Sequence, residues 1–584
     1  MRKEEIVEAV SNVANRKFGP NFNFRPGQRE AIIDILDTYY NTEVETYILE
    51  APTGSGKSLI AMIASAVLEE NGRKGYILTS ELALQDQYHS DFKKYSLKWG
   101  CIKGADTYLC AVNLMPFSLG DCRIQKISYD QAEELPCFSE CGYLQNRKKS
   151  IQAPVSLLNY SYALIQRNYV EDQVLKRGGD PPFPQRDFVF CDEAHGLMDI
   201  VQGHFAPRIN QDLIDAVKYL DGFQRKNGYG NTQIEPQISS LVFLLEHEVD
   251  KSILKNQLKM IYTHLSAQKG KDRMMQEDAP KKFDNWSAIP QDWRRALKYA
   301  DFIKDVHCKV EDFLKIIEGV GVDKMVKTVN VSARDTNEII FNCVDEGYMV
   351  DKYFNQKFGF KVLMSATIGD PRYFMSAIGT RNVRFNRIKS HFNFEKSPIY
   401  FTPRNRITYK NLDERVPVLG EYVTNILRKH SDTSGIIHSG SYSLAKRVWQ
   451  ELPIDLQRRV KLYEGTNEKI NAVGQLEIGN TVIMGPSLLE GLDLSEDTSR
   501  LQIFLKVPYP SLGNNFVKEK MNHYPAWYRW RASIAVQQGV GRSVRSADDW
   551  AITYFLDGCL QDILREEHSF PPDFKNRIIN IDKI

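Results

Sequence analysis

The stretch Ala51-Pro52-Thr53-Gly54-Ser55-Gly56-Lys57-Ser58 constrains this chain more than any other feature. An apolar run typical of a buried strand, Tyr47 to Leu49, precedes it, and an apolar run typical of a buried helix, Leu59 to Leu68, follows it. Glycines let the backbone turn so that successive N–H groups point at phosphate oxygens, and the start of the helix adds a partial positive charge. The pattern therefore predicts a nucleoside triphosphate site within an α/β fold.

The polar side chains of this loop have separate expected roles. We expect Lys57 to reach the β- and γ-phosphates of ATP and the Ser58 hydroxyl to hold Mg²⁺. Ala51 stands where the general P-loop pattern has its first glycine, so a glycine-rich turn with a chance Lys-Ser pair remains the alternative. The residues expected to bind ATP here are Thr53, Gly54, Ser55, Gly56, Lys57 and Ser58.

Length and charge limit the classes of protein that fit. With 584 residues the chain is too long for one hydrophobic core and predicts several domains. The net charge is only +2, so nucleic-acid binding would need local basic patches. No apolar run approaches the roughly 18 to 20 residues of a membrane span, and the start of the chain lacks the apolar core of a signal peptide. We therefore expect a soluble intracellular protein without membrane contact, more in keeping with a cytoplasm than a nucleus.

A second acidic motif follows a strand-like apolar run. Phe188 to Cys191 is apolar, and Asp192-Glu193-Ala194-His195 comes directly after it. A carboxylate at the end of a parallel strand beside a P-loop can hold Mg²⁺, and the next carboxylate can deprotonate the attacking water. We assign Asp192 to the metal and Glu193 to the water, and expect His195 to link the state of ATP to the rest of the molecule. Taken alone, these four letters also arise by chance on a helix.

Together, the P-loop and Asp-Glu-Ala-His resemble the superfamily 2 helicases, and further motifs agree in order. The resemblance implies two RecA-like parallel-sheet lobes that close around ATP. It implies ATP contacts from Arg25, Gln28, Asp493, Gln538, Arg542 and Arg545, and nucleic-acid contacts from Thr79, Ser439 and Ser441. The matching segments are Phe24–Gln28, Leu78–Gln87, Ser365–Thr367, Gly435–Tyr442, Glu490–Leu494 and Gln538–Arg545.

Arg542 also has a physical case of its own. Arginine is always charged and offers a planar fork to phosphate oxygens. If a second lobe supplies it, the site is complete only when the lobes close, so hydrolysis becomes coupled to domain motion. We count Arg542 with Lys57, Asp192 and Glu193 as catalytic. The alternative is a basic helix on the surface.

The chain has nine cysteines, and five of them fall between Cys101 and Cys141. In a reducing compartment such a cluster favours metal or iron–sulfur ligation over disulfides. Lys103 to Cys110 resembles the signature of the XPD/DinG-type DNA helicases, which implies a 4Fe–4S cluster held by Cys110, Cys122, Cys137 and Cys141. Zinc and unliganded thiols remain the alternatives, although structural zinc usually uses Cys-x-x-Cys pairs, which are absent here. We expect Cys101 to be a buried apolar residue.

Two tyrosines near these motifs have open interpretations. We expect the iron–sulfur segment to act as a wedge where duplex separates, with Tyr108 stacking on the strand, although an ordinary surface position fits Tyr108 equally well. Asn159-Tyr160 matches a family element that usually reads Asn-His, so Tyr160 puts the role of that imidazole in doubt.

The order of the motifs predicts a discontinuous first lobe. We expect Ala300 to Ile317 to form an amphipathic helix within a mainly helical insertion, and the polar segment Gln268 to Lys282 to form an exposed loop. The resemblance implies that this insertion is the arch of the family. The expected divisions are lobe 1 in residues 1–100, 146–205 and 346–380, the iron–sulfur segment in 101–145, the arch-like insertion in 206–345 and lobe 2 in 381–584.

The leading functional prediction is an ATP-dependent DNA helicase and translocase. It would use ATP and Mg²⁺, grip the sugar-phosphate backbone largely without sequence preference, and work as a monomer. By resemblance alone, the direction is 5′ to 3′ and the partner is single-stranded or forked DNA. Three alternatives remain: an ATP-hydrolysing scaffold or remodelling factor, an RNA helicase, and a motor fused to a nuclease, for which no separate cluster of metal-binding carboxylates is evident.

Overall fold

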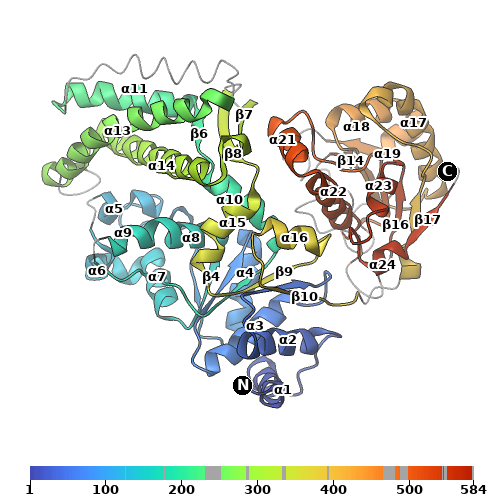
Figure 1. Ribbon diagram of the computed structural model, residues 1–584, viewed down its shortest axis with the longest axis horizontal. Coiled ribbons are helices and arrows are strands. Elements are labelled where there is room, and N and C mark those ends of the chain that lie inside the picture. The colour runs from blue at the N-terminus through green and yellow to red at the C-terminus, as the bar shows by residue number, and fades with distance from the viewer. Residues whose placement is uncertain are drawn as a thin grey trace.

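The computed structural model describes residues 1–124, 127–176, 178–229, 251–283, 288–331, 337–390, 394–463, 476, 480–486, 498–541, 543–544 and 549–581. Two large parallel sheets form the centres of two lobes, and helices with a small antiparallel sheet form an insertion in the first lobe (Figure 1). Among the described residues, no helix has both the length and the apolar content needed to cross a membrane.

The first lobe is built on a sheet with the strand order β10-β1-β9-β5-β2-β4-β3, in which all neighbours run parallel. Its central strands are buried along their whole length because helices cover both faces, which explains why they are nearly continuous apolar runs. The strands are β1 (Thr46–Glu50), β2 (Gly75–Thr79), β3 (Gly100–Cys101), β4 (Val155–Asn159), β5 (Phe188–Cys191), β9 (Phe360–Ser365) and β10 (Val383–Arg387).

The strands expected before the P-loop and before Asp192 are therefore confirmed as β1 and β5. The first sheet also extends past residue 380, where the sequence placed the end of this lobe, because β10 pairs with β1 from Thr46↔Val383 to Glu50↔Arg387. β10 is an edge strand with half-buried side chains. Its mixed polar and apolar residues explain why it lacks the signal of a central strand.

Helices cover the two faces of this sheet in two groups. The hydrophobic core on one face includes α1, α2, α3 and α4, and the core on the other face includes α7, α8, α10, α15 and α16. The helices of the first group are α1 (Lys3–Val13), α2 (Gln28–Asn41), α3 (Lys57–Glu70) and α4 (Leu82–Lys94). Those of the second are α7 (Gly142–Gln152), α8 (Tyr160–Ile165), α10 (Leu197–Phe205), α15 (Glu346–Tyr353) and α16 (Pro371–Ala377), with the short α9 (Glu171–Leu175) after α8.

The segment between β3 and α7 carries the cysteine cluster. It contains only short helices, α5 (Asp121–Ile124) and α6 (Tyr129–Ala132), so its backbone has little regular structure to hold it. Its buried side chains, among them Phe117, Ala132 and Cys141, join the core that covers the adjoining face of the first sheet.

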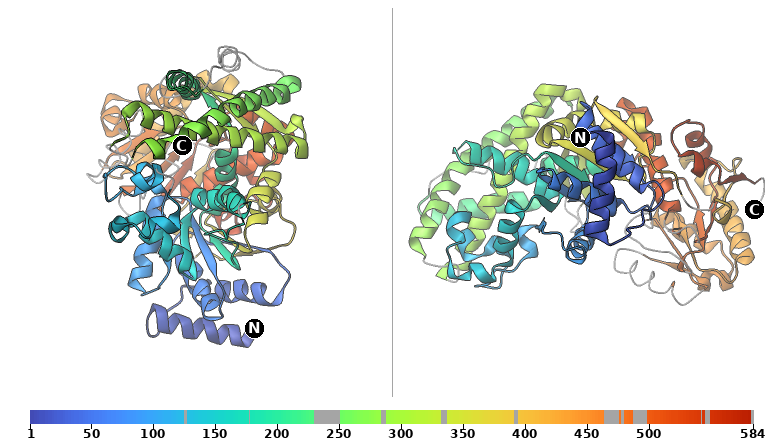
Figure 2. Two further views of the ribbon diagram at one scale, coloured as in Figure 1. Left: turned by 90° about the vertical axis from the view of Figure 1, so that its left-hand side faces the viewer. Right: turned by 90° about the horizontal axis from the view of Figure 1, so that it is seen from below.

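The insertion between β5 and β9 is mainly helical, as expected, and also contains an antiparallel sheet in the order β6-β8-β7. Its described helices lie together on one side of the first lobe in Figures 1 and 2. The helix expected over Ala300 to Ile317 is confirmed within α14. The elements are β6 (Arg208–Asn210), α11 (Gln211–Lys226), α13 (Lys251–Lys282), α14 (Gln291–Val320), β7 (Met325–Val331) and β8 (Asn337–Cys343).

The exposed loop expected over Gln268 to Lys282 is wrong, because this segment is the second half of α13. Gln268 and Asp272 are buried, and the Gln268 amide donates hydrogen bonds to Gln224 at 2.8 Å and to Asp272 at 3.0 Å. The Gln224 amide in turn donates to Asp272 at 2.7 Å. Gln224 of α11 therefore binds the polar side chains of Gln268 and Asp272, and this explains why a polar segment is a buried part of a helix and not a loop.

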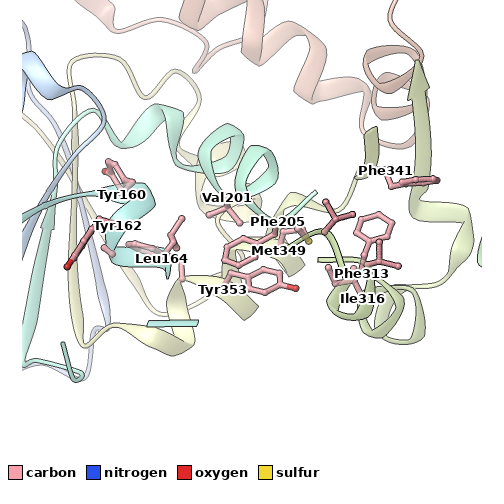
Figure 3. Packing of buried hydrophobic residues seen from close by; sticks show 14 of the residues in the cluster. Tyr160, Tyr162, Leu164, Val201, Phe205, Phe313, Ile316, Phe341, Met349 and Tyr353 are labelled. Atoms are coloured by element: carbon pink, nitrogen blue, oxygen red, sulfur yellow. The ribbon is translucent and has the colours of Figure 1, made fainter. Parts of the chain in front are cut away.

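The insertion shares one continuous core with the first lobe (Figure 3). Phe205 of α10 and Tyr353 of α15 stack with ring centroids 3.7 Å apart, next to Phe313 and Ile316 of α14. Trp527 and Trp530 of the second lobe belong to the same core. Since a packed core transmits displacement, the three parts are mechanically connected.

The second lobe has a parallel sheet in the order β13-β14-β12-β15-β16-β11-β17, with its own core on each face. The strands expected at 481–484, 502–505 and 552–556 are confirmed as β14, β15 and β16. The strands are β11 (Ile399–Phe401), β12 (Gly435–His438), β13 (Val460–Leu462), β14 (Val482–Gly485), β15 (Leu501–Phe504), β16 (Ile552–Phe555) and β17 (Ile578–Asn580). The helices are α17 (Leu412–Lys429), α18 (Tyr442–Gln450), α19 (Ile454–Arg459), α21 (Asn515–His523), α22 (Pro525–Val540), α23 (Leu560–Leu564) and α24 (Pro572–Lys575).

Candidate active site

The P-loop connects β1 to α3 at the carboxyl edge of the first sheet, the usual ligand edge of parallel sheets. Gly54 and Gly56 have φ angles of +80° and +79°, a region that L side chains rarely adopt. A Cβ atom at Gly56 would lie 2.3 Å from Nε2 of Gln28. Both glycines are therefore required by backbone shape, and Lys57 begins α3 where N–H groups are free to bind phosphate.

Arg25 and Gln28, expected to contact ATP, fold over this loop. The Gln28 amide donates to the carbonyl of Gly56 at 3.3 Å, and the Arg25 guanidinium donates to the carbonyl of Gly54. The Arg25 backbone N–H donates to the Gln28 side chain at 2.8 Å. Arg25, from the segment before α2, and Gln28, the first residue of α2, thus both reach the P-loop.

Asp192 lies directly after β5 and is only 2% exposed. Its carboxylate accepts hydrogen bonds from the Tyr88 hydroxyl and from the backbone N–H of Glu193, both at 2.9 Å. Burial raises the pKa of Asp192, and the charge of Lys57 opposes that rise. A buried, hydrogen-bonded carboxylate close to the P-loop lysine is suited to a cation that arrives with phosphate.

Glu193 connects the P-loop to His195. Its Oε1 lies 3.8 Å from Nζ of Lys57, and its Oε2 lies 3.3 Å from Nδ1 of His195. Its φ angle is +53°, in the left-handed region that is strained for a glutamate. Strain of this kind collects at functional sites, and here it directs the carboxylate toward the P-loop.

His195 joins the two lobes. Nδ1 lies 2.9 Å from the Ser365 hydroxyl at the end of β9, and Nε2 lies 2.7 Å from the Gln538 amide nitrogen in α22 of the second lobe. Because the amide N–H donates to Nε2, the hydrogen of the ring is on Nδ1, which donates to Ser365. The structure thus brings Gln538 to His195, and this contact connects the ATP-binding strands to the second lobe.

Three residues expected at the ATP site, Asp493, Arg542 and Arg545, lie outside the described residues.

Buried Ser55, Thr79 and Thr367 each have a hydroxyl with no hydrogen-bond partner in the described part of the chain. Ser55 belongs to the P-loop, so its hydroxyl is available to a ligand there.

The four cysteines assigned to iron–sulfur form no disulfide with one another. Cys110, Cys122 and Cys141 are buried, and Cys137 is half-buried. Burial raises the pKa of Cys122 to about 11, and the other three thiols of the set add to that rise. Within the described ranges, no group of three or more His, Cys, Asp or Glu side chains is arranged to hold a single metal ion. Cys101 is buried, as expected, and burial raises its pKa to about 11.

The residues expected to contact nucleic acid lie at strand ends or inside the cysteine segment. Thr79 ends β2, and the Ser441 hydroxyl accepts from the N–H of Leu444 at 3.1 Å at the start of α18. Ser439 donates to the Ser441 carbonyl at 3.0 Å. The Tyr108 ring packs edge-on against Tyr143, with centroids 5.6 Å apart, so part of it serves internal packing.

Two tyrosines at Asp192 had no assigned role in the sequence. The Tyr160 hydroxyl donates to the backbone carbonyl of Asp192 at 3.0 Å, and Tyr88 contacts the Asp192 carboxylate, as described above. The sequence marked Tyr160 as unusual, because it stands where the family element usually has a histidine. Tyr88 gave none, because it lies 104 residues from its partner.

Comparisons with known proteins agree with this geometry. Residues 21–216 match the family model described as "Type III restriction enzyme, res subunit", and residues 426–567 match "Helicase C-terminal domain". The chain is 22% identical to "ATP-dependent DNA helicase YoaA" of Escherichia coli (strain K12), over 93% of this chain and 92% of that protein. It is 35% identical to "ATP-dependent DNA helicase DinG" of the same strain over 16% of this chain and 14% of that protein.

Two solved structures share the fold. "Structure of S. tokodaii Xpd4" has a TM-score of 0.59 and 14% identity, over 95% of this chain and 99% of that chain. "XPD_Helicase" has a TM-score of 0.59 and 15% identity, over 96% of this chain and 100% of that chain.

A P-loop and Asp-Glu-Ala-His lie in one lobe, and His195 connects that lobe to a second parallel-sheet lobe. This arrangement defines an enzyme that hydrolyses ATP next to the junction of two lobes. This class is the superfamily 2 helicases. The similarity to the relatives named YoaA and DinG, and the fold shared with the XPD structures, agree with the XPD/DinG type.

Proposed function

We propose that the protein is an ATP-dependent DNA helicase that moves along single-stranded DNA and separates duplex. The observation that carries this proposal is the hydrogen-bonded chain from Ser365 through His195 to Gln538. It joins the ATP-binding sheet to the second lobe, so closure of the lobes around ATP and their reopening after hydrolysis would move one grip on the strand relative to the other. The names of the relatives support DNA as the substrate.

The chemistry at the first lobe follows from its side chains. We propose that Lys57 and the P-loop N–H groups hold the phosphates, and that Ser58 and Asp192 hold Mg²⁺, for which hydroxyl and carboxylate oxygens are suitable donors. When bound, Mg²⁺ neutralises charge that develops on the phosphates. Glu193 orients the attacking water and takes its proton.

The second lobe would complete this site. We propose that Asp493, Gln538 and Arg545 help to bind the nucleotide, and that Arg542 stabilises charge on the γ-phosphate when the lobes are closed.

We propose that Cys110, Cys122, Cys137 and Cys141 hold a 4Fe–4S cluster. Their thiols lie close enough to act on one another's pKa. Burial raises the pKa of Cys141, and N–H groups of Leu144 and Tyr143 at the start of α7 oppose that rise. When bound, the cluster would tie together a segment that has few helices of its own. A rigid segment beside the motor, with the exposed part of Tyr108 available to stack, would act where the duplex opens.

The path and polarity of the strand are also proposals. Thr79, Ser439 and Ser441 lie at the ends of β2 and β12 or just after them, and we propose that they contact the sugar-phosphate backbone of single-stranded or forked DNA. Movement is 5′ to 3′, as the resemblance implies. The protein works as a monomer, and its E. coli relatives support a cytoplasmic location.

A strand-displacement assay tests the proposal. Forked DNA with a labelled strand and either a 5′ or a 3′ single-stranded tail is mixed with protein and ATP, with an RNA fork as comparison. We expect displacement of the DNA fork that carries a 5′ tail. Hydrolysis of ATP without displacement of any fork would contradict the proposal and favour a scaffold, and displacement of RNA alone would favour an RNA helicase.

A further inference from the structure

Two buried tyrosines hold Asp192 through different atoms. The Tyr88 hydroxyl, from α4, donates to Oδ2 of the Asp192 carboxylate at 2.9 Å, while the Tyr160 hydroxyl, from α8, donates to the Asp192 backbone carbonyl at 3.0 Å. Both side chains are at most 1% exposed. The remaining carboxylate oxygen, Oδ1, accepts from the N–H of Glu193. Among the residues that the structure describes, the carboxylate therefore has one donor on each oxygen.

Other contacts of α4 fix the position of the Tyr88 hydroxyl. One turn before it, the buried Gln85 amide donates to the carbonyl of Ile102 at 2.9 Å. One turn after it, Phe92 packs edge-on against both Tyr88 and Trp99, with centroids 6.4 Å and 5.1 Å apart. A donor held on both sides in this way is pre-oriented, because its ring has no room to rotate away.

An oriented donor matters for a carboxylate that binds a cation. A free carboxylate rotates about its Cβ–Cγ bond and loses that freedom on binding, so a partner that fixes its plane beforehand raises the affinity for the metal. Each carboxylate oxygen has two lone pairs, so the bond from Tyr88 leaves Oδ2 able to contact a metal or a metal-bound water.

We propose that Tyr88 is the positioning residue of the Mg²⁺ site, and that its hydrogen bond to Asp192 sets how strongly Mg²⁺-ATP is bound. This inference rests on the proposed role of Asp192 as a metal ligand. Tyr160 acts differently, because it secures the main chain where β5 ends and does not touch the carboxylate.

The two tyrosines form a matched pair for the test. Tyr88→Phe and Tyr160→Phe each remove one buried hydroxyl and keep the ring. Mg²⁺ is titrated into each variant with a fluorescent ATP analogue held below its metal-free dissociation constant, and the increase in bound analogue is measured without any turnover. We expect Tyr88→Phe to raise the half-saturating Mg²⁺ concentration about 10- to 100-fold, the range typical of partners that orient metal ligands. We expect a much smaller rise for Tyr160→Phe.

The variant Asp192→Asn separates failure of this inference from failure of the proposed function. If binding of the analogue to Asp192→Asn depends on Mg²⁺ as it does in the wild type, Asp192 is not a metal ligand. If Asp192→Asn loses that dependence while Tyr88→Phe keeps it, only the role of Tyr88 is overturned. An equal rise in both tyrosine variants would also overturn it, since general packing would then account for the effect. Metal-free binding of the analogue checks that each P-loop is folded.

Discussion

A buried ion pair between the second lobe and α15 of the first lobe offers a quantitative test of the packing. Lys520 of α21 pairs with Glu346 of α15, and their side chains are 1% and 7% exposed. The ammonium also lies 4.4 Å from the ring centroid of Trp527. Burial lowers the pKa of Lys520 well below its ordinary value, and the charge of Asp199 opposes that shift.

The perturbation is Lys520→Met. Methionine keeps most of the apolar stem that packs on Trp527, so the substitution mainly removes the positive charge. Removal of one member of a buried pair leaves the other charge without a partner, which typically costs about 3–5 kcal/mol. We expect this loss in the free energy of unfolding. The double variant Lys520→Met/Glu346→Leu should recover most or all of it, because no uncompensated buried charge remains.

Urea unfolding followed by circular dichroism measures the effect, with the midpoint compared among the two single variants and the double variant. The exposed ion pair of Arg273 and Glu277 serves as the control, since Arg273→Met should leave the urea midpoint nearly unchanged. A cost below about 1 kcal/mol for Lys520→Met, or a double variant as unstable as the single one, would refute the reasoning.

Four further predictions concern the site and its surroundings. Glu193→Gln should bind ATP but hydrolyse it about 100- to 10,000-fold more slowly, and rapid phosphate release would place the base elsewhere. Gly56→Ala should weaken nucleotide binding by an amount that reflects about 1–2 kcal/mol of left-handed strain, whereas Gly72→Ala, with φ +75° and open space around it, should leave that affinity unchanged. Cys110→Ser should lose the broad visible absorbance of an iron–sulfur cluster together with strand separation while keeping some ATPase activity, and a colourless wild-type protein that contains zinc would contradict the cluster. Burial lowers the pKa of His204 from 6.5 to about 4, so the stability that the neutral ring contributes is present above pH 6.5 and is lost as the pH falls toward 4. His204→Phe should therefore lose less thermal stability than the wild type between pH 6.5 and pH 4. Equal losses of thermal stability would contradict the assignment.

The ATP site of the first lobe could be predicted because its chemistry is local. A strand, a glycine-rich turn and a helix follow one another around Lys57, and Asp192 follows a strand in the same way. The resemblance to the helicases brought these two segments together before the fold was known. The contact between His195 and Gln538 was foreseen only as a general coupling role, since its geometry depends on how two lobes dock.

Other parts of the fold depend on partners that the local sequence does not contain. The segment Gln268 to Lys282 is polar enough to suggest a loop, yet hydrogen bonds to Gln224 of another helix stabilise it as α13. β10 has few apolar residues because it lies at the edge of the sheet. Tyr88 lies one turn from residues of a helicase motif, but nothing near it in the chain indicates that its hydroxyl meets Asp192.

The central claim is that ATP closes the two lobes and that His195 transmits this closure. Single-molecule energy transfer between dyes on two exposed residues, Asn71 of the first lobe and Ile454 of the second, measures it directly. We predict that a non-hydrolysable ATP analogue shifts the population to a shorter inter-dye distance, and that His195→Ala weakens this shift while ATP still binds. An unchanged distance in wild-type protein saturated with the analogue would contradict the account.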